Sequence, residues 1–354
     1  MKKKLVTGVI AAAMAASLAA CGSSSSSTTT TTTTASTEAA TTAATEAAAA
    51  ETTASATASA DGKTYKVGVC QLVQHEALDA ATQGFEDVLT KALGDNVTID
   101  VQNAQGDSTT CATIVNGFVS NEYDLILANA TPALQAAVAA TTDIPILGTS
   151  ITDYGTALNM SDLSGTTGIN VSGTSDLAPL DQQEDMILEL VPDVKNVGIL
   201  YCSAEPNSKF QATQIEKYLD EDGVAYTEYT FSDSNDLQSV VTSAAGSSDA
   251  IYIPTDNTAA SNMTVISNVT EPAKIPIICG EENMCKSGAL ATLSISYYDL
   301  GTATGNMALD ILQNGADIST MEVQYASATT KEYNQEYADA IGFTMPDGYT
   351  PIAD

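Results

Sequence analysis

The sequence contains no arginine and no tryptophan, and its single histidine is His75. Without arginine, the planar two-point clamp that a guanidinium places on a carboxylate or phosphate is excluded. One histidine excludes a zinc site that is built from several histidines. The chain has 12 cationic residues, all lysines, and 44 acidic ones, so its formal net charge is −32. This balance excludes the basic surface that nucleic-acid binding needs.

The first residues have the form of an export signal. Three lysines at 2–4 precede an apolar run over 5–18, which is too short to span a bilayer as a mature helix. The tetrapeptide LAAC at 18–21 follows, and small residues that end in cysteine resemble a bacterial lipobox. The alternative is an ordinary signal peptide that ends near a cysteine. We expect residues 1–21 to be a lipoprotein signal peptide, with a lipidated Cys21 that anchors the chain to the extracytoplasmic face of the cell membrane.

Residues 22–63 are predicted to be a tether. From 22 to 60 the chain is Ser, Thr and Ala, interrupted only by Gly22 and by glutamates at 38, 46 and 51. Such a segment buries too little apolar area to offset the entropy of ordering. As a flexible coil it would reach roughly 35 Å, which separates the folded part from the membrane.

Beyond residue 64, short apolar runs such as Lys66–Cys70 alternate with segments that carry apolar residues at helical spacing. A second run of strands and helices begins after a Gly- and Ser-rich stretch over 165–173. The pattern predicts an α/β fold with two Rossmann-like, doubly wound lobes and a cleft between them. The expected lobes are 64–170 plus about 293–325, and 171–292 plus the C-terminal segment to 354.

Polar side chains follow the predicted strands, at the edge where both lobes would face the cleft. Hydroxyls and free N–H groups at helix N-termini bind anions, whereas carboxylates bind an ammonium group. This mixture suits a zwitterion, such as an amino acid, better than a phosphate or a neutral sugar. The ligand-binding residues predicted on this basis are Gln71, His75, Thr131, Thr149, Ser150, Asp176, Glu205, Asn207, Thr255, Asp256, Asn257 and Glu281.

The absence of arginine limits how a ligand carboxylate can be held. It must rest on backbone N–H groups, hydroxyls or a lysine, and no lysine is among the predicted site residues. We expect Thr131 to cap a helix that points at the cleft and to form a carboxylate cradle with Thr149 and Ser150. Asp256 or Glu281 from the second lobe would then hold the ammonium group.

Five segments of the folded part resemble one family. They are QLVQHEALDA at 71–80, QNAQGD at 102–107, ATPA at 130–133, YIPTDNT at 252–258 and GALATL at 288–293. In this order they are similar to ABC transporter substrate-binding lipoproteins of the tryptophan/tyrosine type, and the resemblance covers about 64–345. The chain departs from the family at Cys279 and Cys285 and at the pair Glu281-Glu282.

The resemblance implies a type I periplasmic-binding-protein fold, with a three-stranded hinge and lobes that close on the ligand. It also implies a monomeric, lipid-anchored receptor that captures an amino acid, with aromatic ones favoured, and delivers it to the permease and ATPase subunits of an ABC importer. A sensor or receptor of the same fold, or a binder of nucleosides or sugars, is the alternative. No metal, cofactor or nucleic acid is expected as a partner, because the residues and the acidic charge balance offer no site for one.

An enzyme on a similar scaffold is disfavoured. His75 could act as a base, contact the ligand or simply start a helix, but nothing here resembles a nucleophile elbow that it would activate. Gly68 and Gly84 do not form the turn of a dinucleotide site, and no cysteine spacing is typical of zinc. Cys279 and Cys285 flank a short loop, and a disulfide between them is the alternative to the free thiols that we favour.

Overall fold

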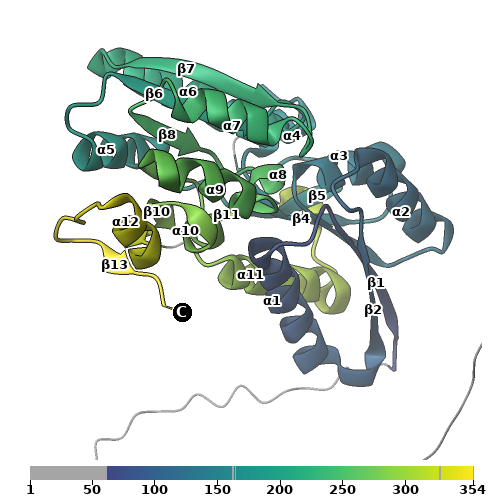
Figure 1. The fold of residues 1–354 in the computed structure, drawn as a ribbon. Coiled ribbons are helices and arrows are strands. Elements are labelled where there is room, and N and C mark those ends of the chain that lie inside the picture. The colour runs from purple at the N-terminus through teal and green to yellow at the C-terminus, as the bar shows by residue number, and fades with distance from the viewer. Residues whose placement is uncertain (1–61, 162, 164, 327, 354) are drawn as a thin grey trace, which may run out of the picture. The chain divides into compact units, whose positions relative to one another are not determined.

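The computed structural model describes residues 62–161, 163, 165–326 and 328–353. The predicted signal peptide, the lipidation site Cys21 and the predicted tether up to residue 61 lie outside the described residues. The described part contains two mostly parallel sheets that helices cover (Figure 1). The predicted α/β fold with two Rossmann-like lobes is confirmed.

The first sheet has six strands in the order β11-β5-β4-β3-β1-β2, and all neighbours pair in parallel. Alternate residues of a strand point to opposite faces. Val67 and Val69 therefore pack on the face of α1 and α11, whereas Cys70 packs on the face of α2 and α3. The elements of this lobe are β1 (Tyr65–Gln71), α1 (Glu76–Leu93), a 3₁₀ turn (Gly94–Asn96), β2 (Val97–Asn103), α2 (Ser108–Ser120), β3 (Leu125–Asn129), α3 (Thr131–Ala140), β4 (Ile146–Ile151), α4 (Tyr154–Leu158), β5 (Val171–Ser175), α11 (Tyr297–Asn314), a second 3₁₀ turn (Ile318–Thr320) and β11 (Gln324–Tyr325).

The second sheet has seven strands in the order β13-β12-β10-β9-β8-β6-β7. β10 and β12 run antiparallel, and the other neighbours run parallel. The central strands are apolar and buried throughout, as is typical of a parallel sheet covered on both faces. The elements are α5 (Leu180–Leu190), β6 (Asn196–Cys202), α6 (Pro206–Asp222), β7 (Ala225–Phe231), α7 (Leu237–Ala245), β8 (Ala250–Ile253), α8 (Asn257–Ala260), α9 (Met263–Ala273), β9 (Ile277–Cys279), α10 (Glu282–Gly288), β10 (Ala291–Ser294), β12 (Thr330–Tyr333), α12 (Gln335–Ile341) and β13 (Thr350–Pro351).

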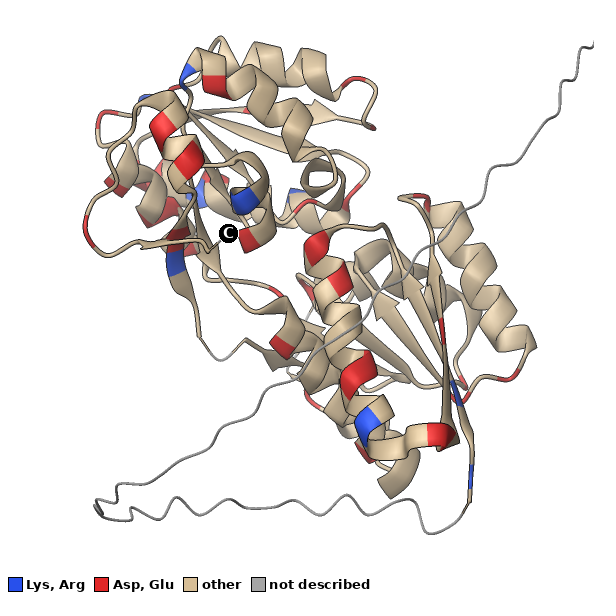
Figure 2. Cartoon of the chain, turned by 60° about the horizontal axis from the view of Figure 1, so that its bottom comes forward, with Lys and Arg blue, Asp and Glu red and all other residues tan. Residues whose placement is uncertain are grey.

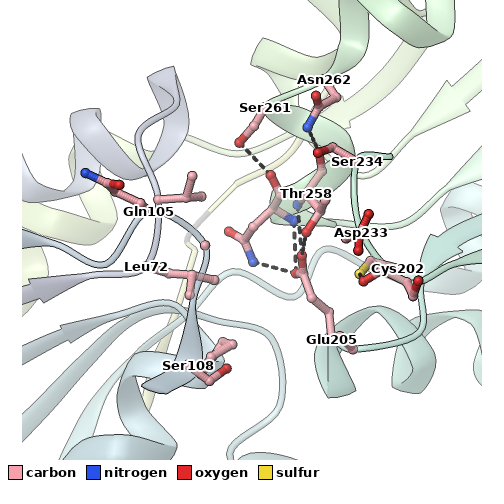
Figure 3. Close-up of a pocket in the computed structure, with 16 residues that line it drawn as sticks. Leu72, Gln105, Ser108, Cys202, Glu205, Asp233, Ser234, Thr258, Ser261 and Asn262 are labelled. Carbon is pink, nitrogen blue, oxygen red and sulfur yellow. Dashed lines mark hydrogen bonds between the residues drawn. The ribbon is translucent and has the colours of Figure 1, made fainter. Parts of the chain in front are cut away.

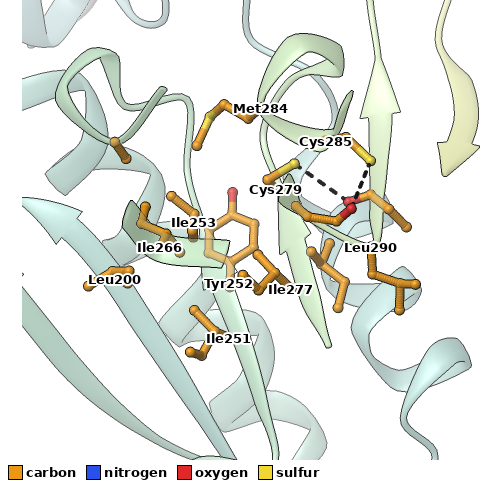
Figure 4. Close-up of a cluster of buried hydrophobic side chains, with 14 of the residues drawn as sticks. Leu200, Ile251, Tyr252, Ile253, Ile266, Ile277, Cys279, Met284, Cys285 and Leu290 are labelled. Carbon is orange, nitrogen blue, oxygen red and sulfur yellow. Dashed lines mark hydrogen bonds between the residues drawn. The ribbon is translucent and has the colours of Figure 1, made fainter. Parts of the chain in front are cut away.

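The core of the second lobe surrounds Tyr252, which is fully buried on β8 (Figure 4). Cys279 and Cys285 lie in the same core, and both are free and buried. Their Sγ atoms contact the carbonyl oxygens of Ala291 and Ala289, each at 3.7 Å. These thiols are therefore part of the packing of the lobe.

The chain passes between the two sheets three times. It leaves the first sheet after β5, returns after β10, and crosses again between β11 and β12. Two boundaries differ from the expected ones, because β5 (Val171–Ser175) belongs to the first sheet and β10 extends the second to Ser294. The sequence VSGTS lacks large apolar side chains and resembles a linker, yet every residue of it is buried.

Two local features also differ from the expected ones. The N-cap of α3 is Ala130, so Thr131 is the first helical residue and its buried hydroxyl has no hydrogen-bond partner. The apolar pattern over 259–269 predicts one helix, but the structure has two, because the chain leaves the helical conformation at Asn262, the N-cap of α9.

Helices α1 and α11 lie side by side and approach closely at glycines (Figure 1). A Cβ atom on Gly301 would lie 1.9 Å from the carbonyl oxygen of Ala81, and one on Gly84 would lie 2.2 Å from that of Tyr298. Only glycine permits such an approach of two backbones. Since α11 follows directly from the hinge and α1 begins at the cleft, this contact links the two.

Acidic residues are spread over both lobes and basic ones are few (Figure 2). A surface of one sign favours solubility through mutual repulsion. Within the described ranges, no helix is both long and apolar enough to cross a membrane. Nor do these residues bring together three His, Cys, Asp or Glu side chains that could hold a metal ion.

Candidate functional site

Two cavities lie where the strand ends of the two sheets face each other. The inner compartment has a volume of about 10 Å³, which is room for about one water molecule. The outer compartment, of about 240 Å³, is lined by Leu72 and Pro132 of the first lobe and by Glu205 of the second, and Asn257 lines both compartments (Figure 3). The inner compartment is lined by His75, Leu78, Ser150, Thr152, Asp176, Asn207, Thr255, Asp256, Asn257, Ala260, Glu281 and Tyr297.

The polar side chains of the inner compartment come from the carboxyl ends of parallel strands. Ser150 is the second-last residue of β4, Asp176 directly follows β5, and Glu281 follows β9. Ligands of open α/β sheets bind at this edge. The backbone is strained here, since Ala130 and Ser150 have φ angles of 86° and 56°, which residues other than glycine rarely adopt. Such strain concentrates at functional sites.

Asp176 lies at the first hinge crossing and is only 3% exposed. The Tyr297 hydroxyl, at the start of α11, donates to Asp176 Oδ2 at 2.9 Å, whereas Oδ1 has no partner. Burial raises the pKa of the Asp176 carboxyl. The hinge therefore holds this carboxyl in place and leaves one oxygen for a ligand.

Glu281 and Asp256 are buried acids that each cap a helix. Glu281 accepts hydrogen bonds of 2.7 Å from two N–H groups in the first turn of α10. Asp256 accepts from the N–H groups of Ala259 and Cys202, at 2.8 and 2.7 Å. Burial raises the pKa of Glu281 to about 7 and that of Asp256 to about 8. A cation in the compartment would stabilise the ionised form of both groups.

Glu205 orients the start of α8. Its Oε1 atom accepts from the N–H and the hydroxyl of Thr258, at 2.8 and 2.7 Å. Its Oε2 atom accepts from the backbone N–H and the Nδ2 of Asn257, at 3.0 and 2.7 Å. The Asn257 amide is thereby turned so that Oδ1 faces His75 Nε2 of the first lobe, 3.2 Å away. This contact joins the two lobes across the cleft.

Buried polar atoms without a partner gather at the inner compartment. They include His75 Nδ1, Ser150 Oγ, Asp176 Oδ1 and Asn207 Oδ1, and all four residues line it. Buried polar groups are normally hydrogen-bonded, so we expect each of these four atoms to gain a partner when a ligand binds. The carboxyl and amide oxygens accept hydrogen bonds, and no lysine is among the described residues that line either compartment. The compartment is therefore suited to a ligand that brings hydrogen-bond donors.

Comparison with known proteins decides the family. Residues 66–353 match the family described as ABC transporter substrate binding protein. The chain belongs to this family. It is similar to the tyrosine-binding protein of Clostridioides difficile (strain R20291), with 38% identity over 286 residues that cover 79% of this chain and 82% of that protein. The family predicted from the five segments is confirmed, and it is a family of binding proteins.

Two solved structures are similar to this substrate-binding protein. The ABC domain from Streptococcus pneumonia in complex with L-Trp is 35% identical, with coverage of 82% of this chain and 100% of that chain and a TM-score of 0.77. The ligand-free, open structure of a Clostridium difficile substrate-binding protein with adhesive properties is 38% identical, with coverage of 81% and 99% and a TM-score of 0.62. The structure superposes better on the L-Trp complex despite the lower identity.

Most of the predicted ligand-binding residues of this substrate-binding protein meet in one place. Glu205 lines the outer compartment, where its carboxylate is already bonded to α8. Those that line the inner compartment are His75, Ser150, Asp176, Asn207, Thr255, Asp256, Asn257 and Glu281.

Gln71 is not among the residues that line either compartment. Its Nε2 donates to Asp79 Oδ1 at 2.6 Å, and its Oε1 accepts from the Thr82 hydroxyl at 2.7 Å. The amide therefore ties the end of β1 to the beginning of α1. It has a structural role that the sequence pattern does not distinguish from ligand contact.

The structure does not assemble the predicted cradle of Thr131, Thr149 and Ser150, because only Ser150 lines the inner compartment. The Thr149 hydroxyl lies 3.2 Å from that of Thr174, which lies 2.9 Å from that of Thr304 on α11. Thr149 therefore points toward α11. Successive residues of a strand face opposite sides, which separates Thr149 from the cavity.

Further residues line the inner compartment beyond those predicted, and Thr152 and Tyr297 are the polar ones. Thr152 lies two residues after Ser150, so the period of a strand could have indicated it. Tyr297 meets Asp176 across 121 residues of sequence, through the hinge. No local spacing relates these two residues, so the sequence carries no signal for their contact.

Proposed function

We propose that this protein is the lipid-anchored, extracytoplasmic receptor of an ABC importer, and that it captures an aromatic amino acid between its lobes for delivery to the permease and ATPase subunits. Membership of the substrate-binding family supports the receptor role. The tyrosine-binding relative and the related L-Trp complex support an aromatic ligand.

One observation favours an amino acid over the other ligand classes: the inner compartment contains buried hydrogen-bond acceptors that have no donor. An ammonium group offers three N–H donors and a positive charge, and it is about the size of the water molecule that the compartment has room for. It would satisfy His75 Nδ1, Asp176 Oδ1 and Asn207 Oδ1, which are buried and unpaired. A neutral sugar would leave the charge of the buried acids unpaired, which is costly.

The carboxylate and the aromatic ring of the proposed ligand would also lie against groups that suit them. The Ser150 hydroxyl is buried without a partner, and α1 is an 18-residue helix whose N-cap side chain makes no capping hydrogen bond. Both can stabilise a carboxylate, since the N-terminus of a helix carries partial positive charge. The aromatic ring would occupy the outer compartment, against Leu72, Val73 and Pro132.

Isothermal titration calorimetry tests the ligand class. L-Tryptophan, L-tyrosine and L-phenylalanine are titrated beside indole-3-propionate, glucose and adenosine. We expect one site for the aromatic amino acids and about 10- to 100-fold weaker binding of indole-3-propionate, which lacks the ammonium group. Binding of glucose or adenosine without binding of any amino acid would show that the proposal is wrong.

The membrane anchor is tested separately, because it rests on the LAAC sequence at 18–21, outside the described residues. Cys21→Ser is expected to move the protein from the membrane fraction to the medium, since two acyl chains are lost. Ser25→Ala, in the same segment, is the matched control and should stay with the membrane. Retention of the Cys21 variant on membranes after a salt wash would refute the anchor.

Transport and sensing would use the same binding site, so uptake must be measured directly. If the protein delivers its ligand to a permease, cells that lack it should lose uptake of labelled L-tryptophan or L-tyrosine at low external concentration. Unchanged uptake together with tight binding in vitro would favour a sensor of the same fold.

A further inference from the structure

Resting on the proposed amino-acid ligand, we propose that His75 determines specificity. Its Nδ1 atom accepts a hydrogen bond from the ammonium group of the ligand, and the second lobe fixes the tautomer that makes this atom an acceptor. The contacts of Nε2 thereby determine the role of Nδ1.

The tautomer of His75 is set by a chain of hydrogen bonds that starts at a carboxylate. Glu205 Oε2 accepts from Asn257 Nδ2 at 2.7 Å, so the amide nitrogen is engaged as a donor. Asn257 Oδ1 is thereby the atom that faces His75 Nε2, at 3.2 Å. An amide oxygen only accepts, so Nε2 must carry the proton. In the neutral ring the lone pair then lies on Nδ1.

The environment keeps this ring neutral near pH 7. Burial lowers the pKa of His75, and the hydrogen bond with Asn257 and the carboxylates of Glu205, Asp79 and Glu76 oppose this effect only in part. His75 Nδ1 is buried and has no partner, and the residue lines the inner compartment together with Asp176 and Asn207. The lone pair on Nδ1 is therefore unsatisfied, and the ammonium group proposed for this compartment supplies the missing donor.

This arrangement couples recognition to closure. Asn257 belongs to the second lobe and His75 to the first, so the tautomer is fixed only when the lobes are together. A ligand with an ammonium group satisfies Nδ1 in the closed state, whereas a deaminated analogue leaves a buried acceptor unpaired, which is costly. His75 would thus favour amino acids over the corresponding acids.

Two variants of His75 distinguish the role of Nδ1 from that of Nε2. In His75→Gln the amide reaches the position of Nε2, so the contact with Asn257 is kept and the Nδ1 acceptor is lost. In His75→Asn the amide oxygen takes the position of Nδ1, so the acceptor is kept and the contact with Asn257 is lost. The readout is the ratio of the dissociation constants of indole-3-propionate and L-tryptophan, with thermal melting of each variant to verify folding.

We expect His75→Gln to reduce this ratio about 2- to 10-fold, because Asp176 and Asn207 still accept from the ammonium group. His75→Asn should weaken the binding of both compounds in proportion and keep the ratio near that of the parent. An unchanged ratio in His75→Gln would overturn the inference. The inference would also be overturned if the ratio fell in His75→Asn but not in His75→Gln, because His75 would then act only as a link between the lobes.

Nitrogen NMR provides a readout that does not depend on variants. The chain has one histidine, so the ¹⁵N spectrum of the untagged, full-length protein contains a single imidazole. With saturating L-tryptophan we expect a protonated Nε2 and an unprotonated Nδ1 that is shifted as a hydrogen-bond acceptor. A proton on Nδ1 would overturn the inference. If the parent protein binds no aromatic amino acid, the proposed function fails and the role of His75 with it, whereas discrimination in the parent protein that His75→Gln leaves unchanged overturns only the role of His75.

Discussion

At the scale of single residues, Asp176 connects the hinge to the ligand. Tyr297 holds one of its oxygens, and the other faces the inner compartment unpaired. We expect Asp176→Asn to weaken L-tryptophan binding about 10- to 100-fold, because a charge-assisted hydrogen bond to the ammonium group becomes a neutral one. Calorimetry measures this change, and unaltered affinity would place the ammonium group elsewhere.

Thr149→Val is the matched control on the neighbouring strand. The Thr149 hydroxyl bonds to Thr174 and does not line the inner compartment. We therefore expect unchanged affinity and a loss of about 1 kcal/mol in the free energy of unfolding, which is typical of one buried hydrogen bond. A loss of affinity in this variant would show that Thr149 does contact the carboxylate of the ligand.

The buried acids also predict how stability depends on pH. In the folded state the pKa of Glu281 is about 7 and that of Asp256 about 8, raised by burial from 4.5 and 3.8. The folded state thus binds more protons than the unfolded state, so the free energy of unfolding of the ligand-free protein should rise as the pH falls from 8.5 to 6. The expected gain is on the order of 1–3 kcal/mol.

Urea denaturation at pH 8.5 and pH 6 measures this dependence, with Glu281→Gln as the control that should reduce it, since Asp256 remains. Affinity for L-tryptophan should change in the opposite sense, since an ammonium group prefers the ionised acids. If the ligand-free protein were less stable at pH 6, the two groups would not be buried as described.

At the scale of elements, the close approach of α1 and α11 positions the site. A Cβ atom at Gly301 would lie 1.9 Å from a backbone oxygen of α1. Gly301→Ala should therefore push the helices apart and destabilise the protein by about 1–3 kcal/mol, as overpacking does. In Gly117→Ala, on α2, the added Cβ meets nothing within 4 Å, and we expect a gain of about 0.5–1 kcal/mol. Urea denaturation compares them, and equal effects would contradict this packing.

The elements themselves could largely be predicted from sequence, because their apolar residues follow regular periods. The helix at Leu180–Leu190 and the strand at Ala250–Ile253 are examples. Strand β5 could not be predicted in this way. Its sequence VSGTS has no large apolar residue, and it is a strand only because β4 and β11 flank it. The same limit applies to the site: position after a strand indicates Ser150 and Asp176, but not which way Thr149 points.

At the scale of the whole described structure, closure depends on the ligand. Closing an empty cleft buries Asp176, Glu281 and several unpaired acceptors without compensation, which is unfavourable. We therefore expect the ligand-free protein to open at pH 8.5, where the buried acids ionise, and L-tryptophan to close it by rotation at the hinge. Small-angle X-ray scattering should show a smaller radius of gyration with saturating L-tryptophan, and glucose is the control. An unchanged radius would count against ligand-driven closure.

Enclosure of an aromatic amino acid between the two lobes is directly measurable, because the chain contains no tryptophan. Excited selectively, L-tryptophan added to the protein is the sole indole that emits. We predict a blue-shifted emission that saturates at one ligand per chain and is displaced by L-tyrosine, because the ring moves from water into the outer compartment. An emission spectrum identical to that of free L-tryptophan at every protein concentration, with no displacement by L-tyrosine, would contradict the account.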